Sequence, residues 1–547
     1  MAIYSFKNLT FTYSTKNTPT LNKIDLEIEK GGFYIICGKS GSGKSTLLKL
    51  MKKELTPRGK CDGQVLYKNT NVNLLDSRVS AQEIGFLHQD IENGLVCDKV
   101  WKELSFGLGN LGYSDDYISA RVAEVCEYFG ISKWYNKKIS DLSGGSKQIV
   151  SLAAIMTTNP EVLLLDEPTS MLDPIAKKNF VNLLVRINKE LGVTIVVVEH
   201  NMENLFEVAT KTIVVDDGEV AICTEPLLLP QTLKDKHYAK YIGLTEFAEI
   251  FSALGGSGKI PVDIENKRKW LKNCYKDNYN NEKIDSNNGL KTDFSDNTIL
   301  SAENLYFRYK KNEEDIIKGC NFNLQKGEVV CILGGNGGGK TTFVNLLAKI
   351  LKPYSGYIKM DKSKKIGLLA QNAKGLFVED SVQNEMYVTA KLLKKDKSLA
   401  EQLMRQFELL HIADSHPYDI SGGEVQRLAL AKLFLVSPDI IILDEPTQGM
   451  DMLNKEYLKN LIFEQKKLGK SIIVVTHDLR FAAEMGDRVG LFFDGKILSL
   501  RQAKDFFADN SLYTTESSLL TRDFAKDLYT VQKVVDCINK NTQEELL

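Results

Sequence analysis

Two glycine-rich segments of this chain have the residue types and spacing of phosphate-binding loops. They read GKSGSGKS at residues 38–45 and GGNGGGKT at residues 334–341. Closely spaced glycines let backbone N–H groups turn toward an anion at a helix N-terminus, where the helix dipole also favours phosphate. Lys44 and Lys340 would then reach the β- and γ-phosphates of a nucleotide, while the hydroxyls of Ser45 and Thr341 would face Mg²⁺.

The segments on either side of each loop support this interpretation. Each loop follows an apolar run typical of a strand, at 33–37 and 329–333, and precedes a stretch typical of a helix, at 47–51 and 343–350. A phosphate-binding loop requires this order of strand, loop and helix. The alternative is a flexible turn, which we expect for GGSGK at 255–259, because Ala253 stands where the first glycine belongs and Ile260 where the hydroxyl belongs.

A second pair of apolar runs ends in two acids. Residues 162–167 and 440–445 end in Asp-Glu and continue as Pro-Thr, and such runs are typical of parallel strands buried on both faces. We expect Asp166 and Asp444 to hold Mg²⁺ through its water shell, and Glu167 and Glu445 to orient or deprotonate an attacking water. A surface turn could also carry this sequence, but its pairing with a phosphate loop in both copies favours the chemical role.

The chain is therefore an internal duplicate, since Lys44, Glu167 and His200 recur in the same order as Lys340, Glu445 and His477. Residues 278–297 between the copies are rich in Asn, Asp and Lys, which is typical of a solvated linker. We predict a first nucleotide-binding domain at 1–228, a helical extension at 229–277, a polar linker at 278–297, a second nucleotide-binding domain at 298–505 and a C-terminal helical tail at 506–547.

Composition limits the partners and the compartment. The formal net charge of −1 over 547 residues carries no overall electrostatic footprint for nucleic acid or anionic lipid. No apolar run approaches the ~18 residues of a membrane span, and the N-terminus lacks a signal segment, so we expect a cytosolic chain. Nine cysteines without CxxC spacing indicate reduced thiols, not a disulfide framework or a zinc site.

Together these motifs resemble the nucleotide-binding domains of ABC ATPases. The resemblance includes the signature sequences LSGGS at 142–146 and ISGGE at 420–424, each before its candidate catalytic glutamate; Ser146 departs from the usual Gln or Glu. It implies an α/β fold with two P-loop NTPase domains of the ABC type in tandem. Each domain would have a RecA-like core, an antiparallel β part and a helical subdomain.

The resemblance also assigns residue roles in ATP binding and hydrolysis with Mg²⁺. Its catalytic residues would be Glu167, His200, Glu445 and His477, with each histidine contacting the γ-phosphate. Tyr13 and Tyr309, in short strands near each domain start, would stack on adenine. Nucleotide-binding residues would be Tyr13, Gly38, Lys39, Ser40, Gly41, Ser42, Gly43, Lys44, Ser45, Thr46, Gln89, Ser143, Gly144, Gly145, Tyr309, Gly334, Gly335, Asn336, Gly337, Gly338, Gly339, Lys340, Thr341, Thr342, Gln371, Ser421, Gly422 and Gly423. Metal contacts would come from Ser45, Gln89, Asp166, Thr341, Gln371 and Asp444.

The family further implies that the two halves form an intramolecular head-to-tail dimer with two active sites. One site would join Lys44, Ser45, Glu167 and His200 to the signature at Ser421. The other would join Lys340, Thr341, Glu445 and His477 to the signature at Ser143. Neither half lacks a residue of this set, so we expect both sites to hydrolyse ATP.

Two classes of ABC ATPase compete. Residues 89–112, with the run VWKELSFG, and the stretch 242–271 resemble the ATPases of energy-coupling factor (ECF) importers. That resemblance implies a peripheral protein on the cytoplasmic face of the cell membrane, with an integral membrane coupling subunit and a substrate-binding membrane subunit as partners. We expect the surface of residues 89–112, including Asp98 and Glu103, to receive a helix of the coupling subunit. The alternative is a soluble ABC-F-like factor acting on the ribosome, although its long charged helical arm is absent; a duplicated sugar-importer ATPase is a third possibility.

Overall fold

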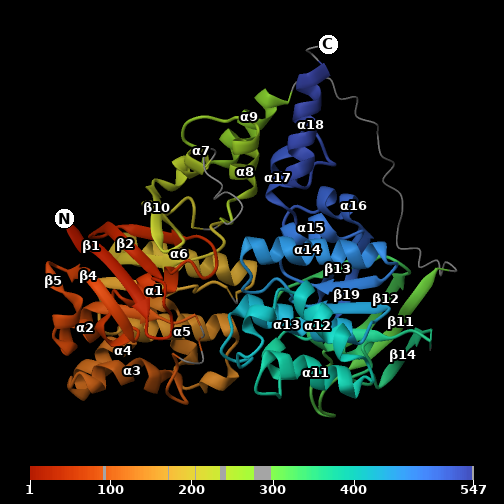
Figure 1. Cartoon of the computed structure of the whole chain (residues 1–547), viewed down its shortest axis with the longest axis horizontal. Helices are drawn as coiled ribbons and strands as arrows, with labels where there is room; N and C mark the ends of the chain where they lie inside the picture. Colours follow the sequence, from red (N-terminus) through yellow and green to blue (C-terminus); the bar gives the residue numbers. More distant parts are fainter. Residues whose placement is uncertain are drawn as a thin grey trace. The chain divides into compact units, whose positions relative to one another are not determined.

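A computed structural model describes two compact units. It covers residues 1–89, 91, 94–170, 172–203, 205–233, 242–275, 297–361 and 363–544, without the side chains of 541–544. The first unit comprises residues 1–262 with 451–453, and the second comprises 263–450 with 454–547. Figure 1 draws the first half of the chain from red to yellow and the second from green to blue. The predicted linker at 278–297 lies outside the described residues except for Asn297.

A six-stranded sheet forms the core of the first unit. All neighbouring strands are parallel except the antiparallel edge strand β10, and strands β3, β7 and β8 are buried along their whole length. Because parallel strands end at the same edge of a sheet, the segments that follow β3, β7 and β8 meet there. The strand order is β10 (Glu219–Thr224), β9 (Lys211–Asp216), β3 (Phe33–Cys37), β8 (Thr194–Val198), β7 (Val162–Asp166) and β6 (Ile84–Leu87).

An antiparallel sheet and a helical subdomain complete this unit. The antiparallel sheet alternates buried and exposed residues, as expected for a sheet with one face on the core. Helices α3, α4 and α5 pack on one another around Val100, Leu104 and Val150, and Figure 1 shows them together in orange. The strands are β2 (Leu21–Glu29), β1 (Ala2–Tyr13), β4 (Gly59–Tyr67) and β5 (Thr70–Asn71); the main helices are α1 (Lys44–Lys49), α2 (Ser77–Glu83), α3 (Val100–Asn110), α4 (Asp115–Phe129), α5 (Gly144–Met156) and α6 (Pro174–Leu191).

The second unit repeats the six-stranded core sheet strand for strand, and its antiparallel sheet lacks only a counterpart of β5, which confirms the predicted tandem of two α/β P-loop domains. Its sheets run in the same spatial order, with a parallel core and one antiparallel edge strand. The core order is β15 (Ile366–Leu369), β16 (Ile440–Asp444), β17 (Ser471–Val475), β13 (Val329–Leu333), β18 (Arg488–Phe493) and β19 (Lys496–Gln502). The antiparallel sheet contains β12 (Ile317–Gln325), β11 (Thr298–Phe307) and β14 (Ser355–Met360); the main helices are α10 (Lys340–Leu347), α11 (Val382–Leu392), α12 (Lys397–Gln406), α13 (Gly422–Leu435), α14 (Met452–Lys467) and α15 (Leu479–Met485).

The helices after the first domain divide between the two units. Helices α7 (Leu229–Leu233) and α8 (Glu246–Ala253) belong to the first unit, whereas α9 (Ile264–Cys274) packs on α17 (Glu516–Thr521) of the second. Lys267 forms an ion pair with Glu516 at 3.1 Å, and Arg268 donates to the Leu519 carbonyl at 2.8 Å. Helix α9 buries only Lys267 and Leu271, so it has too little apolar surface to fold without this neighbour. Two more helices, α16 (Ala503–Asp509) and α18 (Val531–Glu544), complete the tail.

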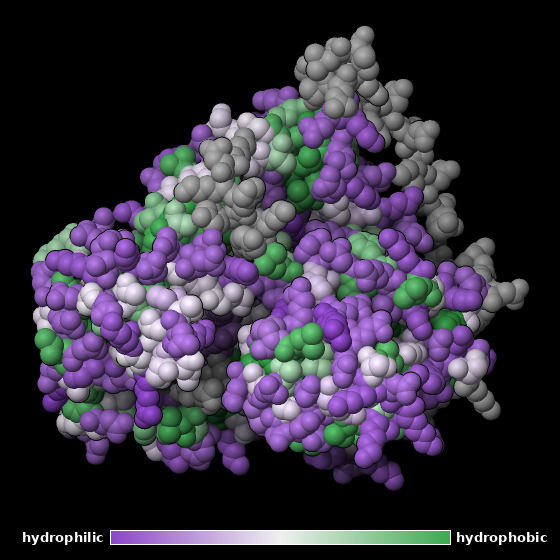
Figure 2. All heavy atoms as spheres, in the orientation of Figure 1, coloured by the Kyte–Doolittle hydropathy of each residue, from purple (hydrophilic) through white to green (hydrophobic). Residues whose placement is uncertain are grey.

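The surface and the cysteines agree with the composition. Among the described residues, no helix has the length and apolar character needed to cross a membrane. Figure 2 shows hydrophilic residues over most of the visible face of each unit, with hydrophobic atoms in small groups. All nine cysteines lie in described segments and none forms a disulfide.

Candidate functional site

Each phosphate loop connects a buried strand to a helix, as predicted. Gly43 and Gly339 stand at the N-cap of α1 and α10 with φ of 102° and 98°, a left-handed conformation that favours glycine. A Cβ on Gly43 would lie 2.7 Å from the Leu21 side chain, so the loop also needs glycine there for space. The loops therefore have the backbone shape that lets N–H groups converge on an anion.

The loop lysines are buried and bind their own loops. Lys44 Nζ donates to the carbonyl oxygens of Gly38 and Lys39 at 3.0 and 2.7 Å, and Lys340 Nζ makes the equivalent bonds in the second copy at 2.9 and 3.0 Å. Burial lowers the pKa of Lys44, and Glu167 partly offsets that effect. Each ammonium group is thus held inside the curve of its loop, where a nucleotide phosphate would satisfy its charge.

The Asp-Glu pairs lie at the carboxyl edge of each core sheet, next to the loops. Ser45 donates its hydroxyl to Asp166 Oδ1 at 2.8 Å. Burial raises the pKa of Asp166, and it raises the pKa of Asp444 to about 6, with the nearby Thr341 hydroxyl opposing the rise. Asp444 Oδ1 is buried without a hydrogen-bond partner. The structure therefore brings the hydroxyl and carboxylate of each copy together, as the sequence predicts.

The catalytic glutamates proposed from the sequence share an unusual backbone conformation. Glu167 and Glu445 have φ of 46° and 51°, in the left-handed region that costs a residue other than glycine about 1–3 kcal/mol. Each donates its backbone N–H to the neighbouring strand, to the carbonyls of Val198 and Val475 at 3.0 and 2.8 Å. Strain of this kind persists only where the surrounding contacts determine it, and it aims both carboxylates at the loop edge.

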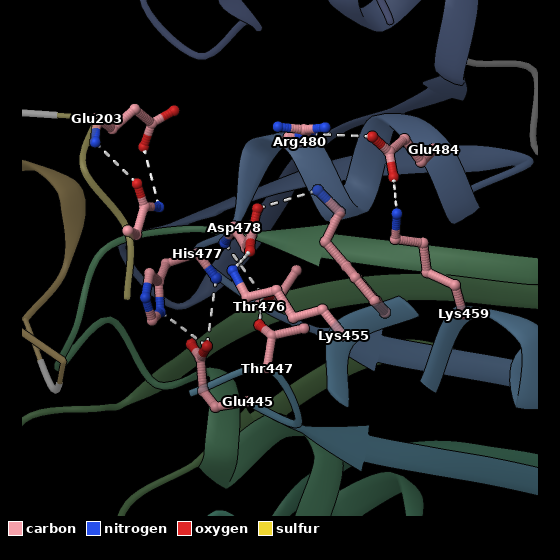
Figure 3. A network of polar contacts seen from close by, with 12 residues as sticks. Glu203, Glu445, Thr447, Lys455, Lys459, Thr476, His477, Asp478, Arg480 and Glu484 are labelled. Carbon is pink, nitrogen blue, oxygen red and sulfur yellow. Dashed lines mark hydrogen bonds and ion pairs between the residues drawn. The ribbon is translucent and has the colours of Figure 1, made fainter. Parts of the chain in front are cut away.

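The histidines predicted to contact the γ-phosphate lie against these glutamates. His200 Nε2 is 3.0 Å from Glu167 Oε1, and His477 Nδ1 is 2.8 Å from Glu445 Oε2. Figure 3 shows the second of these contacts, with the His477 ring beside the Glu445 carboxylate. Both histidines therefore lie beside the glutamates, and their contact with a γ-phosphate stays a prediction.

The two glutamines differ in what they bind. Gln89 donates to Glu167 at 2.7 Å, whereas Gln371 donates to the side chain of Gln448 at 3.1 Å. Both glutamines are exposed, so their amides are available to a ligand. The sequence did not predict the contact with Gln448. The first copy has Ser170 at the matching position, so comparison of the two copies gave no sign of a shared role there.

The signature residues begin a helix in each copy. Ser143 and Ser421 are exposed N-caps of α5 and α13. Gln148, buried in α5, donates to the Pro168 carbonyl at 3.0 Å, and Gln426 makes the equivalent bond to Pro446 at 3.4 Å. Each signature helix is thus bonded to the Asp-Glu-Pro segment of its own copy.

The predicted adenine-stacking tyrosines lie next to the phosphate loops. The Tyr13 hydroxyl is 2.9 Å from the Thr46 hydroxyl, and the Tyr309 hydroxyl is 3.3 Å from that of Thr342. Tyr13 ends strand β1, but Tyr309 lies two residues beyond the end of β11, so its predicted place in a strand is wrong. The ring is still held near the loop, because its hydroxyl contact does not depend on strand pairing.

One residue expected on the surface is buried. Glu103 is 6% exposed, and its Oε2 accepts the backbone N–H groups of Val96 and Cys97 at 3.0 and 2.7 Å. Glu385 accepts two backbone N–H groups in the same way in the second copy. These glutamates hold the loop before their helix, a role that helical spacing alone did not indicate. Asp98 is exposed as expected and pairs with Lys102 at 2.8 Å.

Two anion-binding loops, each beside an Asp-Glu pair at the edge of a parallel sheet, define a nucleotide hydrolase of the P-loop class that carries the site twice. Comparison with known proteins then specifies the family. The ABC transporter family model matches residues 21–170 and 317–448. This chain belongs to the ABC ATPase superfamily, with two ABC domains in tandem, and is an ATP hydrolase.

Its relatives match over nearly the whole chain. A protein of Bacillus thuringiensis subsp. konkukian, provisionally named an ABC transporter ATP-binding protein, is 37% identical over 94% of each chain. A Bacillus subtilis protein, provisionally named an HMP/thiamine import ATP-binding protein, is 30% identical over 90% of this chain and 91% of its own length.

Solved structures agree on the fold. An archaeal ribosome recycling factor, crystallised with a ribosomal stalk protein, aligns with a TM-score of 0.59 and 20% identity over 92% of this chain and 91% of that one. A structure of RNase-L inhibitor aligns with a TM-score of 0.58 and 20% identity over 95% and 99% of the two chains. At this level of identity the likeness concerns the fold alone.

Proposed function

We propose that this chain is the ATP-hydrolysing subunit of a membrane importer, of the energy-coupling factor type, which couples ATP binding and hydrolysis to solute uptake. The observation that carries the proposal is the Bacillus subtilis relative named for import, which matches nine-tenths of both chains. The run VWKELSFG after Gln89 supports the energy-coupling factor type. The chain would act at the cytoplasmic face of the cell membrane, with a coupling subunit and a substrate-binding subunit embedded in it.

In this proposal the chain's own residues perform ATP hydrolysis as follows. The loop N–H groups and Lys44 or Lys340 bind the β- and γ-phosphates and oppose their charge. Glu167 or Glu445 orients the attacking water and accepts its proton, since each carboxylate is held at the sheet edge beside its loop. His200 and His477, already in contact with these carboxylates, would contact the γ-phosphate. Tyr13 and Tyr309 would stack on adenine.

The donor set at each site fits Mg²⁺. The buried, unpaired Oδ1 of Asp444 is an acceptor that a cation would satisfy, and in the first copy Ser45 and Asp166 already converge at 2.8 Å. Hydroxyl and carboxylate oxygens are the donors that this hard cation prefers. Gln89 and Gln371 would supply the remaining side-chain contact. When bound, Mg²⁺ supplies charge neutralisation at the phosphates.

We further propose that each active site uses the signature of the other half. The N-cap serines Ser143 and Ser421 are exposed at the N-termini of α5 and α13, where the helix dipole favours a phosphate. Ser421→Ala should then weaken photolabelling of the first half by an azido-ATP probe when hydrolysis is blocked by the Glu167→Gln and Glu445→Gln variants. Loss of label only in the half that carries the altered signature would refute the crossed arrangement.

The membrane partner would bind the first helical subdomain at the surface of residues 89–112. Val96 and Phe106 are 68% and 44% exposed there, while Val100, Leu104 and Leu108 fill the subdomain core. This surface is in contact with the proposed active site, because Gln89 at its start donates a hydrogen bond to Glu167. If the two domains close around ATP, the change at Glu167 and Gln89 would therefore move a helix of the partner that is bound to this surface.

The deciding experiment is membrane co-purification and solute uptake by Val96→Asp, Phe106→Asp and Asp98→Lys variants. We expect the variants to lose both, while the ATPase rate of the purified chain stays within about twofold. Leu74→Asp is the matched control, because Leu74 is 79% exposed in the same unit but outside this surface. If the parent protein sediments with ribosomes and not with membranes, the importer proposal fails and a soluble ABC-F-like factor replaces it.

A further inference from the structure

One buried acid near the first site has no counterpart at the same position in the second. Strand β8 and the residues after it read TIVVVEHN, whereas β17 continues as SIIVVTHD, so Glu199 matches Thr476 and Asn201 matches Asp478. Glu199 is 3% exposed. A carboxylate next to a buried, mostly apolar strand is costly unless it is hydrogen-bonded or paired with a cation.

Glu199 uses its carboxylate to bind the segment that follows the catalytic glutamate. Its Oε1 accepts the backbone N–H of Thr169 at 2.9 Å and the Thr169 hydroxyl at 2.7 Å. Thr169 stands two residues after Glu167. In the second copy the equivalent contact is only between the hydroxyls of Thr447 and Thr476, at 3.3 Å, and Figure 3 shows these two side chains facing each other.

In the second copy the acid is Asp478, two residues later than the position that matches Glu199, and it binds other partners. Asp478 forms an ion pair with Lys455 at 2.5 Å and caps helix α15 by accepting the Phe481 N–H at 3.0 Å. Figure 3 shows Asp478 directed toward Lys455, with Thr476 and His477 before it. In the first copy the matching lysine is Lys177, whose charge acts on Glu199 and opposes the rise that burial causes in its pKa. Each copy therefore has one lysine and one acid near it; buried Glu199 precedes the histidine, and partly exposed Asp478 follows it.

We propose that Glu199 is a positioning residue of the first active site, which holds Glu167 in its left-handed conformation by binding Thr169. The end of β8 then holds the segment 167–169 at three successive points. The Val198 carbonyl accepts the Glu167 N–H, Glu199 binds Thr169, and His200 contacts the Glu167 carboxylate. The inference rests on the role proposed for Glu167.

The test measures steady-state ATP hydrolysis by the full chain in a Glu445→Gln background, where turnover reports the first site, with Glu199→Val, Glu199→Gln or the exchange Glu199→Thr with Asn201→Asp. We expect Glu199→Val to lower kcat about tenfold and to leave KM for ATP within about twofold, because small misplacements of a reacting group cost rate and Glu199 is not among the proposed nucleotide contacts. Glu199→Gln keeps an acceptor oxygen and should lose less. The exchange rebuilds the second copy's pattern and should return kcat to within about threefold of the parent.

Non-additivity shows whether Glu199 acts through Glu167. In a Glu167→Gln background, Glu199→Val should cause no further loss, since the group that it positions is already absent. A full additional loss in that background, or an unchanged kcat in the Glu445→Gln background where Glu167 is intact, would overturn the inference. If Glu199→Val is unstable, Glu199→Gln and the exchange variant still decide it, because failure of the exchange to restore kcat contradicts the proposed role. Glu167→Gln alone tests the role of Glu167, so the two failures are distinguishable.

Discussion

The two copies have the same core sheet order and the same Asp-Glu ends, yet the glutamates proposed as catalytic have different neighbours in each. Glu167 is bound by Gln89 at 2.7 Å and lies 3.0 Å from His200. Glu445 lies 3.5 Å from the loop lysine Lys340 and 2.8 Å from His477. The comparison teaches that a shared motif sets where the carboxylate stands, while residues outside the motif decide what it binds.

The signature helices differ in the same way. Ser421 and Glu424 form a reciprocal capping box, in which the Ser421 N–H and hydroxyl donate to Glu424 at 2.8 and 2.6 Å. In the first copy Ser146 replaces the acid, and Ser143 meets only the Ser146 hydroxyl, at 3.0 Å, and its N–H, at 3.3 Å. The first signature helix therefore begins with one fewer cap than the second.

The largest expected effect is loss of ATP turnover when the carboxylates proposed as catalytic are removed. Glu167→Gln and Glu445→Gln together should lower ATP turnover about 10²- to 10⁴-fold, the usual contribution of a positioned general base. If the two sites hydrolyse ATP independently and equally, each single change should remove about half of the rate. Glu124→Gln, on the surface of α4, is the control. A double variant with near-parental turnover would show that these carboxylates do not perform the chemistry.

A smaller effect should distinguish Asp478 from Glu199 by the pH dependence of the stability that each contributes. Burial opposes ionisation of Asp478, but Lys455 outweighs it and holds the Asp478 pKa below its usual range. The ionised form thus stabilises the fold at every pH above about 4, the unfolded pKa, and this stability is lost on acidification below it. We expect Asp478→Asn to cost about 1–3 kcal/mol at neutral pH, because the pair is only partly buried, and to cost no less at pH 5.

Glu199 should behave with the opposite sign. Burial raises its pKa, so the folded chain takes up a proton at higher pH than the unfolded chain, and lowering the pH toward about 4.3 favours the fold. The melting temperature of the parent should therefore rise relative to Glu199→Gln between pH 8 and pH 5, whereas the difference from Asp478→Asn stays constant. Thermal unfolding of the three proteins across this range measures both. If the two differences in melting temperature, parent against Glu199→Gln and parent against Asp478→Asn, changed with pH in the same way, the opposite pKa shifts of the two acids would be contradicted.

The smallest expected effect concerns the signature caps. Ser146→Glu should complete a capping box in the first copy and stabilise the start of α5 by about 0.5–1 kcal/mol, while Glu424→Ser should cost the second copy a similar amount. Thermal melting of each variant measures the change. The two variants control for each other, because Ser146→Glu should raise the melting temperature and Glu424→Ser should lower it. Equal shifts in the same direction would show that the capping difference has no energetic consequence.

Sequence reasoning identified most of the architecture because the relevant signals are local. The strands before each loop, the strands that end in Asp-Glu and the signature helices were all placed correctly, since apolar runs and caps depend on near neighbours. It failed where a side chain's environment depends on distant residues. Glu103 was expected on the surface because helical spacing cannot show that its carboxylate turns back to accept Val96 and Cys97. The role of Glu199 was missed for the same reason, although an acid after an apolar strand was a visible signal.

The sequence by itself determined that the chain has two phosphate loops, two Asp-Glu ends and two signatures in one order, because each motif is a short segment whose backbone chemistry requires those residue types. Only the tertiary structure decided which groups bind each glutamate, which partners Glu199 and Asp478 bind, and that helix α9 packs on the tail of the second unit. These outcomes join residues far apart in the chain. They follow from burial and pairing of charges in the folded state, which no local pattern of residues specifies.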